Sequence, residues 1–225
     1  YKHGAKEIAH LNGCSITFMA KPDAQWTGSS SHVHVSLWEP DGATSLFPAE
    51  PGSAEMSTTM RHFLGGLLHA SRELSLFLAS NINSYKRYAV ASWAPVNVVW
   101  SRDNRTCGFR IVGRGSSLRI EDRLPGGDAN PYLTYAAVLA AGLHGIQHGL
   151  EPAPEFRGNA YTAEGVPRVP RSLREAISTW DTSEIAREAF GDDVVAHYRT
   201  MAQVEQDAFD MTVTDWERQR YFERG

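Results

Sequence analysis

The sequence predicts an α+β fold, because strand-like and helix-like patterns both run through a chain of ordinary globular composition. Its 225 residues are 42% hydrophobic, and 22 Lys and Arg stand against 26 Asp and Glu, which gives a formal net charge of −4. This balance argues against disorder, a collagen-like repeat and a membrane-spanning protein. The length fits one large domain or a core with an appendage.

Strand patterns lie in the first part of the chain. Residues 32–38 (HVHVSLW) alternate polar and apolar side chains, so His32, His34 and Ser36 share one face of the expected strand. Further strands are predicted at residues 15–20, 97–100, 108–112 and 117–124.

Helical patterns account for most of the remaining residues. The pair Asn130-Pro131 predicts the start of an Ala-rich helix that ends near Gly149. A proline-containing stretch at residues 151–171 is predicted to be an extended surface linker. Other helices are expected at residues 1–12, 54–80, 172–180, 183–190 and 192–223.

Charge and cysteine content argue against several classes of protein. A net charge of −4 provides no overall positive field for a nucleic acid backbone. Cys14 and Cys107 are too few and too far apart for a disulfide framework or a thiolate metal cage, so we expect reduced thiols. No apolar run has the length of a signal peptide or a membrane span, so we expect a cytoplasmic protein without a membrane partner.

The most informative motif is Arg119-x-Glu121-x-Arg123, on a predicted strand. Period two directs both guanidinium groups and the carboxylate to the same side of the sheet. A solvated charged face would show the same alternation. A binding face is favoured because other strands and loops also supply arginine, whose planar fork suits carboxylates and phosphates. These arginines are Arg87, Arg105 and Arg110.

The histidine pair on the predicted strand at 32–38 suits either a metal ion or an ordinary hydrogen-bonded arrangement. With Glu121, His32 and His34 could contribute to a divalent metal site, although a full shell would need further carboxylates or water. The chain has no Walker-type or GxGxxG loop, and neither cysteine lies in a nucleophile motif. Phosphoryl transfer on an arginine-rich surface, assisted by a metal ion, is the reaction type that matches these residues.

Four blocks of the sequence resemble, in order and spacing, the C-terminal half of the catalytic domain of the glutamine synthetase family. They are SSSHVHVSLW, NSYKRYAVASWAPVNVVWS, DNRTCGFRIVG and LRIEDRLPGGDANPYLTYAAVLAAGLHGI. The resemblance implies a curved antiparallel sheet flanked by helices. It places residues 1–150 in the C-terminal half of that domain and residues 151–225 in its linker and helical tail. It also implies assembly into a homo-oligomeric ring.

The resemblance further implies a two-step reaction that uses ATP as co-substrate and Mg²⁺ or Mn²⁺ as cofactor. ATP phosphorylates the γ-carboxylate of L-glutamate, and ammonia or an amine then attacks the γ-glutamyl phosphate.

The resemblance also implies site residues, carried over residue by residue. The expected metal ligands are His32 and Glu121. The expected substrate-binding residues are Gly28, Arg87, Trp93 and Arg123. The expected ATP-binding residues are His34, Ser36, Arg105, Arg110 and Arg119. The expected catalytic residues are Arg105, Arg123 and Trp93.

The nature of the acceptor depends on Trp93. Glutamine synthetases carry a Gly-Tyr-Glu-Ala-Pro flap whose glutamate helps deprotonate ammonium, whereas residues 91–95 read Ala-Ser-Trp-Ala-Pro. An indole cannot accept that proton, but it can pack on alkyl carbons or bind a cationic amine through its π face. The pattern resembles the γ-glutamylpolyamine and γ-glutamylmonoamide synthetase branch, which implies a polyamine or monoamine acceptor. A tryptophan that only stiffens the flap is the alternative.

Two other functions stay open: a glutamine synthetase that uses ammonia, and a non-catalytic structural relative. The intact metal-ligand and arginine positions argue against the structural relative. The chain has no initiator Met, and the family's other metal-binding glutamates and its β-grasp domain would lie before residue 1. We therefore expect a fragment of a longer protein that is inactive in isolation.

Overall fold

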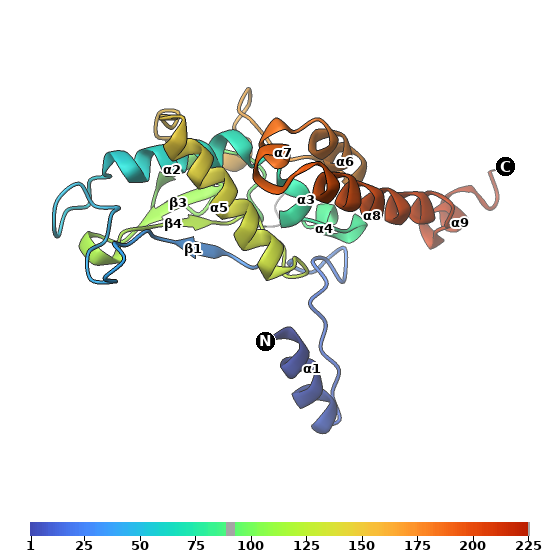
Figure 1. Ribbon diagram of the computed structural model, residues 1–225. Helices are drawn as coiled ribbons and strands as arrows, with labels where there is room; N and C mark the ends of the chain where they lie inside the picture. The colour runs from blue at the N-terminus through green and yellow to red at the C-terminus, as the bar shows by residue number, and fades with distance from the viewer. Residues whose placement is uncertain (89–92, 225) are drawn as a thin grey trace.

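The described residues, 1–88 and 93–224, form a four-stranded sheet at the centre of the computed structural model (Figure 1). In spatial order its strands are β1 (Val33–Val35), β4 (Arg119–Asp122), β3 (Phe109–Val112) and β2 (Trp100–Arg102). β4 pairs antiparallel with β1 and with β3, whereas β2 runs parallel to β3. The predicted α+β fold is confirmed, and the expectation of a purely antiparallel sheet is wrong for β2.

The parallel pair results from a tight return of the chain after β2. Asp103 takes a left-handed backbone conformation with a φ of 48°, which an aspartate tolerates better than most residues. Residues 104–108 then lead back to the start of β2, where the Gly108 N–H donates to the Asn97 carbonyl. Alternation of polarity is the same for both strand directions, so the sequence pattern did not reveal this arrangement.

The strand predicted at residues 15–20 is wrong. This stretch is extended and mostly exposed, and it pairs with no other strand in the part of the chain that the structure describes. Its β-branched and aromatic residues favour a strand only where a partner is available. β2 begins at the last residue of the stretch predicted at 97–100, because Asn97 is instead held in an isolated bridge to Arg168.

Helices α2 (Thr58–Ala70) and α5 (Pro131–Gln147) pack against each other over one face of the sheet (Figure 1). Gly66 permits this close approach, since a Cβ added there would lie 2.0 Å from the Ala141 carbonyl oxygen. Asn130 caps α5 as predicted. The apolar sides of the strands and these helices share one core, which includes Phe63, Phe109, Ile120 and Leu124.

The helix predicted over residues 54–80 is shorter than expected and broken. It consists of α2 and the single turn α3 (Ser75–Leu78), and the short helix α4 (Ile82–Lys86) follows. The Ser71 hydroxyl donates to the Leu67 carbonyl at the end of α2, so a side chain takes a bond that competes with continuation of the helix.

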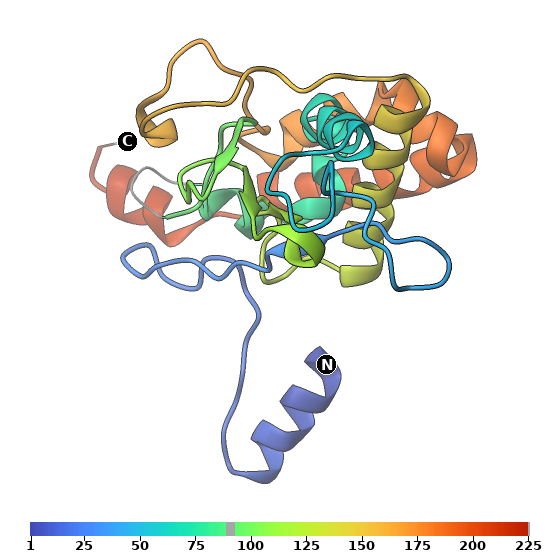
Figure 2. The same cartoon turned by 90° about the vertical axis from the view of Figure 1, so that its left-hand side faces the viewer.

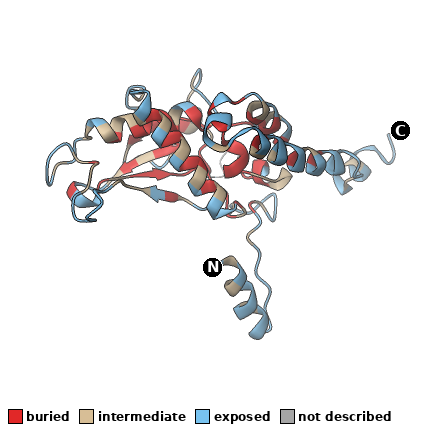
Figure 3. Cartoon of the chain, viewed as in Figure 1, coloured by how far each residue is buried: buried red, intermediate tan, exposed pale blue. Residues whose placement is uncertain are grey.

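The C-terminal tail is helical, as predicted, and consists of α6 (Leu173–Asp181), α7 (Glu184–Phe190), α8 (Asp192–Asp210) and α9 (Asp215–Tyr221). The single helix predicted over 192–223 is wrong, because Thr214 starts a new helix with a capping box to Glu217. Trp180 is fully buried and its ring lies 4.5 Å from that of Phe77, so the tail shares the main core. Figure 3 shows this continuity of buried residues.

Helix α1 (Lys2–Leu11) stands away from the rest of the chain in both views (Figures 1 and 2). Its residues are exposed or half-buried, and Lys2 Nζ donates to the Ala129 carbonyl at 2.7 Å. Two 3₁₀ turns, Gly115–Ser117 and Ala160–Thr162, complete the regular structure of residues 1–88 and 93–224. Among the residues described, no helix combines the length and the apolar character that crossing a membrane requires.

Candidate active site

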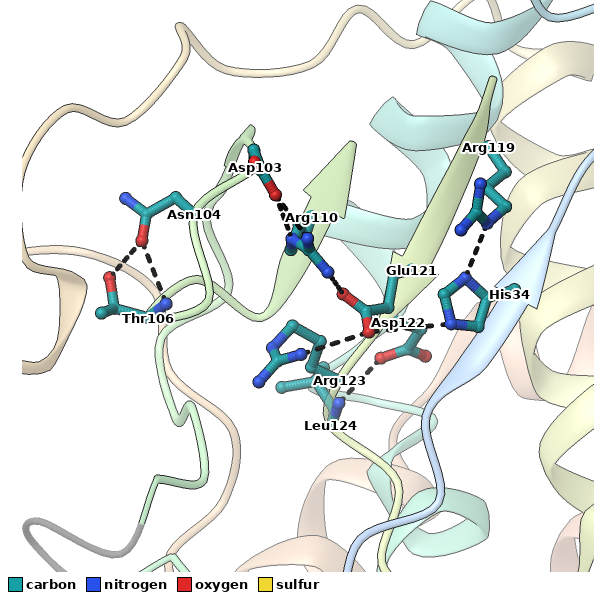
Figure 4. Close-up of polar contacts among 10 residues, drawn as sticks. All are labelled: His34, Asp103, Asn104, Thr106, Arg110, Arg119, Glu121, Asp122, Arg123 and Leu124. Atoms are coloured by element: carbon teal, nitrogen blue, oxygen red, sulfur yellow. Dashed lines mark hydrogen bonds and ion pairs between the residues drawn. The ribbon is translucent and has the colours of Figure 1, made fainter. Parts of the chain in front are cut away.

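Glu121 lies at the centre of the polar face of the sheet. Its neighbours across the strands are His34 on β1 and Arg110 on β3, which the register places directly opposite it. The Glu121 side chain is only 6% exposed. Figure 4 shows His34 of β1, Arg110 of β3 and Arg123, just after β4, around its carboxylate, with Asp103 on the far side of Arg110.

Both oxygens of Glu121 are engaged by arginine. Arg110 Nη1 donates to Oε2 at 3.0 Å, and Arg123 Nη1 lies 3.2 Å from Oε1. Burial alone would raise the pKa of Glu121, but the Arg110 and Arg123 guanidinium groups outweigh it and lower the pKa below its usual range. The carboxylate is therefore ionised, and the predicted common face of Arg119, Glu121 and Arg123 is present.

Asp103 extends this network beyond the sheet. Its Oδ1 accepts a hydrogen bond from Arg110 Nε at 3.0 Å and a second one from Arg110 Nη2. The hydrogen bonds from Arg110 lower the pKa of this exposed carboxyl. Sequence reasoning assigned no role to Asp103, although it opens the block DNRTCGFRIVG that carried part of the family resemblance.

His34 connects Glu121 to Arg119. Arg119 Nε donates to His34 Nδ1 at 3.0 Å, so Nδ1 is the acceptor and the ring proton resides on Nε2. That Nε2 lies 3.7 Å from Glu121 Oε1. Burial lowers the pKa of His34, with Arg119 acting in the same direction and Glu121 against it. The imidazole is accordingly neutral at pH 7.

His32 lies just before β1, and its Nδ1 is buried without a hydrogen-bond partner among the described residues. Burial, followed by the charge of Arg123, lowers the pKa of His32 to about 4, although Glu121 opposes the shift. With His34, Tyr135 and others, His32 lines a groove of about 310 Å³ between β1 and α5. It presents an unprotonated imidazole near the Glu121 network.

Gly28 and Arg87 meet at the end of β4. A Cβ added at Gly28 would lie 2.7 Å from Arg87 Cγ and 2.8 Å from the Ala20 carbonyl oxygen, so this position requires glycine. The Arg87 side chain is buried, and its Nη2 donates to the Leu124 carbonyl directly after Arg123. The structure thus brings the two expected substrate-binding positions together beside Arg123.

Three predicted site residues lie outside this cluster. Arg105 is exposed on the turn after β2, where it interacts electrostatically with Asp103. The Ser36 hydroxyl accepts a hydrogen bond from Trp38 Nε1 at 2.9 Å. Trp93 is 72% exposed and takes a left-handed conformation with a φ of 59°. Its neighbours Ala91 and Ser92 in the flap motif lie outside the described residues.

His32 and Glu121 meet part of what a divalent metal site requires. Metal binding requires a neutral imidazole and an ionised carboxylate, which are the states that His32 and Glu121 adopt. Among the described residues, however, no third His, Cys, Asp or Glu forms a three-ligand group with them. Further ligands would have to be water or residues beyond this chain.

The fold and the site together define an α+β domain in which arginines of the sheet surround the nearly buried carboxylate of Glu121. The family model described as "Glutamine synthetase, catalytic domain" matches residues 1–221. The chain belongs to the glutamine synthetase family. Within it, the relatives described next support the γ-glutamylmonoamide synthetase branch, one of the two branches that the residues predicted.

Relatives of different named activity match along almost the whole chain. It is 57% identical to γ-glutamylethanolamide synthetase GlnA4 of Streptomyces coelicolor, over 100% of this chain and 47% of that protein. It is 44% identical to glutamate–isopropylamine ligase of Pseudomonas sp, over 99% of this chain and 49% of the ligase. It is 34% identical to the glutamine synthetase of Rhizobium meliloti, over 97% of this chain and 52% of that enzyme.

Solved structures of GmaS have the same fold. The chain superimposes on apo GmaS with a TM-score of 0.88 at 33% identity, covering 99% of this chain and 51% of that one. For a GmaS/ADP complex the TM-score is 0.89 at 32% identity, with coverage of 99% and 52%. The chain therefore spans about half the length of the relatives it matches.

Proposed function

We propose that this chain is the C-terminal part of the catalytic domain of a ligase that joins the γ-carboxylate of L-glutamate to an amine at the expense of ATP. The observation that supports this most directly is the pairing of Glu121 with Arg110 and Arg123. An anionic ligand or metal-bound phosphate could replace part of this pairing while the guanidinium groups remain in position.

The proposed reaction has two steps. A γ-carboxylate oxygen of glutamate attacks the γ-phosphorus of ATP, and the bond from that phosphorus to the ADP oxygen breaks. The amine nitrogen then attacks the acyl carbon, loses a proton, and expels inorganic phosphate with the former carboxylate oxygen. Both steps spread negative charge over phosphoryl oxygens, which guanidinium groups stabilise.

Each residue has a defined role in this proposal. Arg110 and Arg119, with His34, Ser36 and the exposed Arg105, bind ATP. Arg123, with Arg105, stabilises the transferring phosphoryl group, and Arg87 and the backbone of Gly28 bind glutamate. We expect His32 and Glu121 to contribute ligands to Mg²⁺ or Mn²⁺, which when bound neutralises phosphate charge.

Trp93 supports an amine as acceptor. Its indole is exposed, and a bulky residue at positive φ is a strained conformation of the kind that clusters at functional sites. Such a ring can cover the alkyl part of an amine or attract its cationic form. Two relatives are named for ethanolamide synthesis and isopropylamine ligation, which agrees with a monoamine. A polyamine is the second possibility.

The quaternary arrangement is also proposed from the family. We propose that residues 1–150 and 151–225 belong to one catalytic domain, because both contribute to one core. In the longer protein, copies of this domain would assemble into a homo-oligomeric ring.

Phosphate release by the protein that contains this chain tests the proposal. With ATP, Mg²⁺ and glutamate, we expect faster release when ethanolamine, isopropylamine or putrescine is added than when ammonium is added. The similarity to named glutamine synthetases makes ammonia the competing acceptor. Activity with ammonium alone would establish that alternative, and absence of both turnover and ATP binding would indicate a non-catalytic relative.

A further inference from the structure

A group of side chains that could hold a metal ion lies away from the Glu121 network, where α5 meets α7. His144 and His148 come from the last turn and the C-cap of α5, and Glu188 comes from α7. One ligand atom from each of the three lies within 4.8 Å of the others. These residues have no part in the function proposed above.

The positions of the ligand atoms match those around a small transition metal. His144 Nδ1 lies 3.2 Å from Glu188 Oε2. Two ligands bound tetrahedrally at Zn–N and Zn–O distances of about 2.0–2.2 Å would lie about 3.3–3.5 Å apart. An ion could therefore enter between them after a movement of a few tenths of an ångström.

A hydrogen bond already orients the second histidine. His148 Nδ1 donates to the His144 carbonyl at 2.9 Å, which leaves its Nε2 as the nitrogen with a free lone pair. When one ring nitrogen of a histidine binds a metal, the N–H of the other ring nitrogen commonly donates a hydrogen bond to a backbone carbonyl. The two rings lie with their centroids 4.1 Å apart.

The surroundings also favour a cation. Both histidines are at the C-terminal end of α5, where the helix dipole is negative. The nearest arginine in sequence to Glu188 is Arg187, and its guanidinium is bound to Asp192 and to the Asp181 carbonyl. The guanidinium of Arg187 is thus bound by groups other than Glu188.

We propose that His144, His148 and Glu188 bind a late first-row divalent metal of the Zn²⁺ type and that this ion clamps α7 to the end of α5. Two imidazoles and one carboxylate suit Zn²⁺ and leave one position for water, whereas Mg²⁺ prefers oxygen ligands. Because α7 leads directly into α8, the clamp would stabilise the docking of the C-terminal helices on the core.

Metal analysis after dialysis against micromolar Zn²⁺ tests this site in the protein that contains the chain. We expect the wild type to retain one Zn²⁺ per chain more than either His148→Ala or Glu188→Gln. Zn²⁺ should raise the Tm of the wild type by about 2–4 °C, and Mg²⁺ should give no such difference between wild type and variants. His148 and Glu188 are exposed, so both variants should fold, which circular dichroism without metal would verify.

His3→Ala is the matched control. His3 Nε2 lies 3.0 Å from Glu7, which reproduces the His–Glu pair, but no third ligand joins it among the described residues. This variant should retain as much Zn²⁺ as the wild type. Equal retention by all variants, loss in His3→Ala as well, or retention only at millimolar Zn²⁺ would overturn the proposal and leave an ordinary ion pair.

Discussion

Arg119 donates a 3.0 Å hydrogen bond to His34 Nδ1, and this contact directs the protonated nitrogen of His34 toward Glu121. Arg119 Nη1 is held in turn by the Ser117 carbonyl at 3.0 Å. The arginine therefore orients the histidine beside the central carboxylate, in addition to presenting its own charge.

Arg119→Lys should separate charge from geometry. Lysine retains the positive charge but loses the Nε donor and the planar fork. We expect the KM for ATP to rise about tenfold, which corresponds to about 1.4 kcal/mol, with little change in Tm. Arg114→Lys, an exposed arginine on the same connection, should leave the KM unchanged. An equal effect in both variants would contradict a specific role for Arg119.

Glu121→Gln removes the negative charge that two guanidinium groups share. We expect turnover to fall about 100-fold or more and the free energy of unfolding to fall by about 2–4 kcal/mol, because Arg123 loses its carboxylate partner and Arg110 keeps only Asp103. Steady-state assays and urea unfolding would measure the two effects. Asp103→Asn, at the exposed end of the same network, should have a smaller effect on stability. Wild-type stability and turnover in Glu121→Gln would argue against the central role of this carboxylate.

Gly28→Ala should be destabilising because the added methyl group would collide with Arg87 and the Ala20 carbonyl. We expect a loss of about 1–3 kcal/mol in unfolding free energy, together with a raised KM for glutamate. Gly4→Ala provides the comparison, since nothing lies within 4 Å of its added Cβ in helix α1. That substitution should be neutral or stabilise by up to about 1 kcal/mol. Chemical denaturation of both variants decides whether steric contact is the cause.

Trp93→Glu should change the preference for the acceptor. A carboxylate can accept a proton from ammonium, whereas loss of the indole removes the surface for the alkyl part of an amine. We expect the ratio of kcat/KM for ethanolamine to that for ammonium to fall about tenfold or more, equivalent to about 1.4 kcal/mol. The similarly exposed Trp26 supplies the control Trp26→Glu, which should leave the ratio unchanged. An unchanged ratio in Trp93→Glu would favour a tryptophan that only stiffens the flap.

Period-two patterns predicted the polar face of the sheet well, because alternation within one strand is a local property. Arg119, Glu121 and Arg123 were expected on one side, and their contacts agree with it. Pairing between strands is not local, so alternation did not reveal that β2 runs parallel to β3. Nor did it reveal that residues 15–20, predicted as a strand, pair with no other strand among the described residues.

The candidate metal group at α5 shows the same limit. The spacing of His144 and His148 is visible in the sequence, but Glu188 joins them only because α7 folds back onto α5. Likewise, Asp103 reaches Arg110 through a turn whose left-handed residue gives no strong signal in the sequence.

Isotope transfer from glutamate to phosphate tests the central proposal most directly. Glutamate labelled with ¹⁸O in both γ-carboxylate oxygens would be incubated with ATP, Mg²⁺, ethanolamine and the protein that contains this chain. If a γ-glutamyl phosphate forms, each released phosphate carries one ¹⁸O atom. Amide formation accompanied by unlabelled phosphate would contradict it, because no bond between the γ-carboxylate and phosphorus would then have formed.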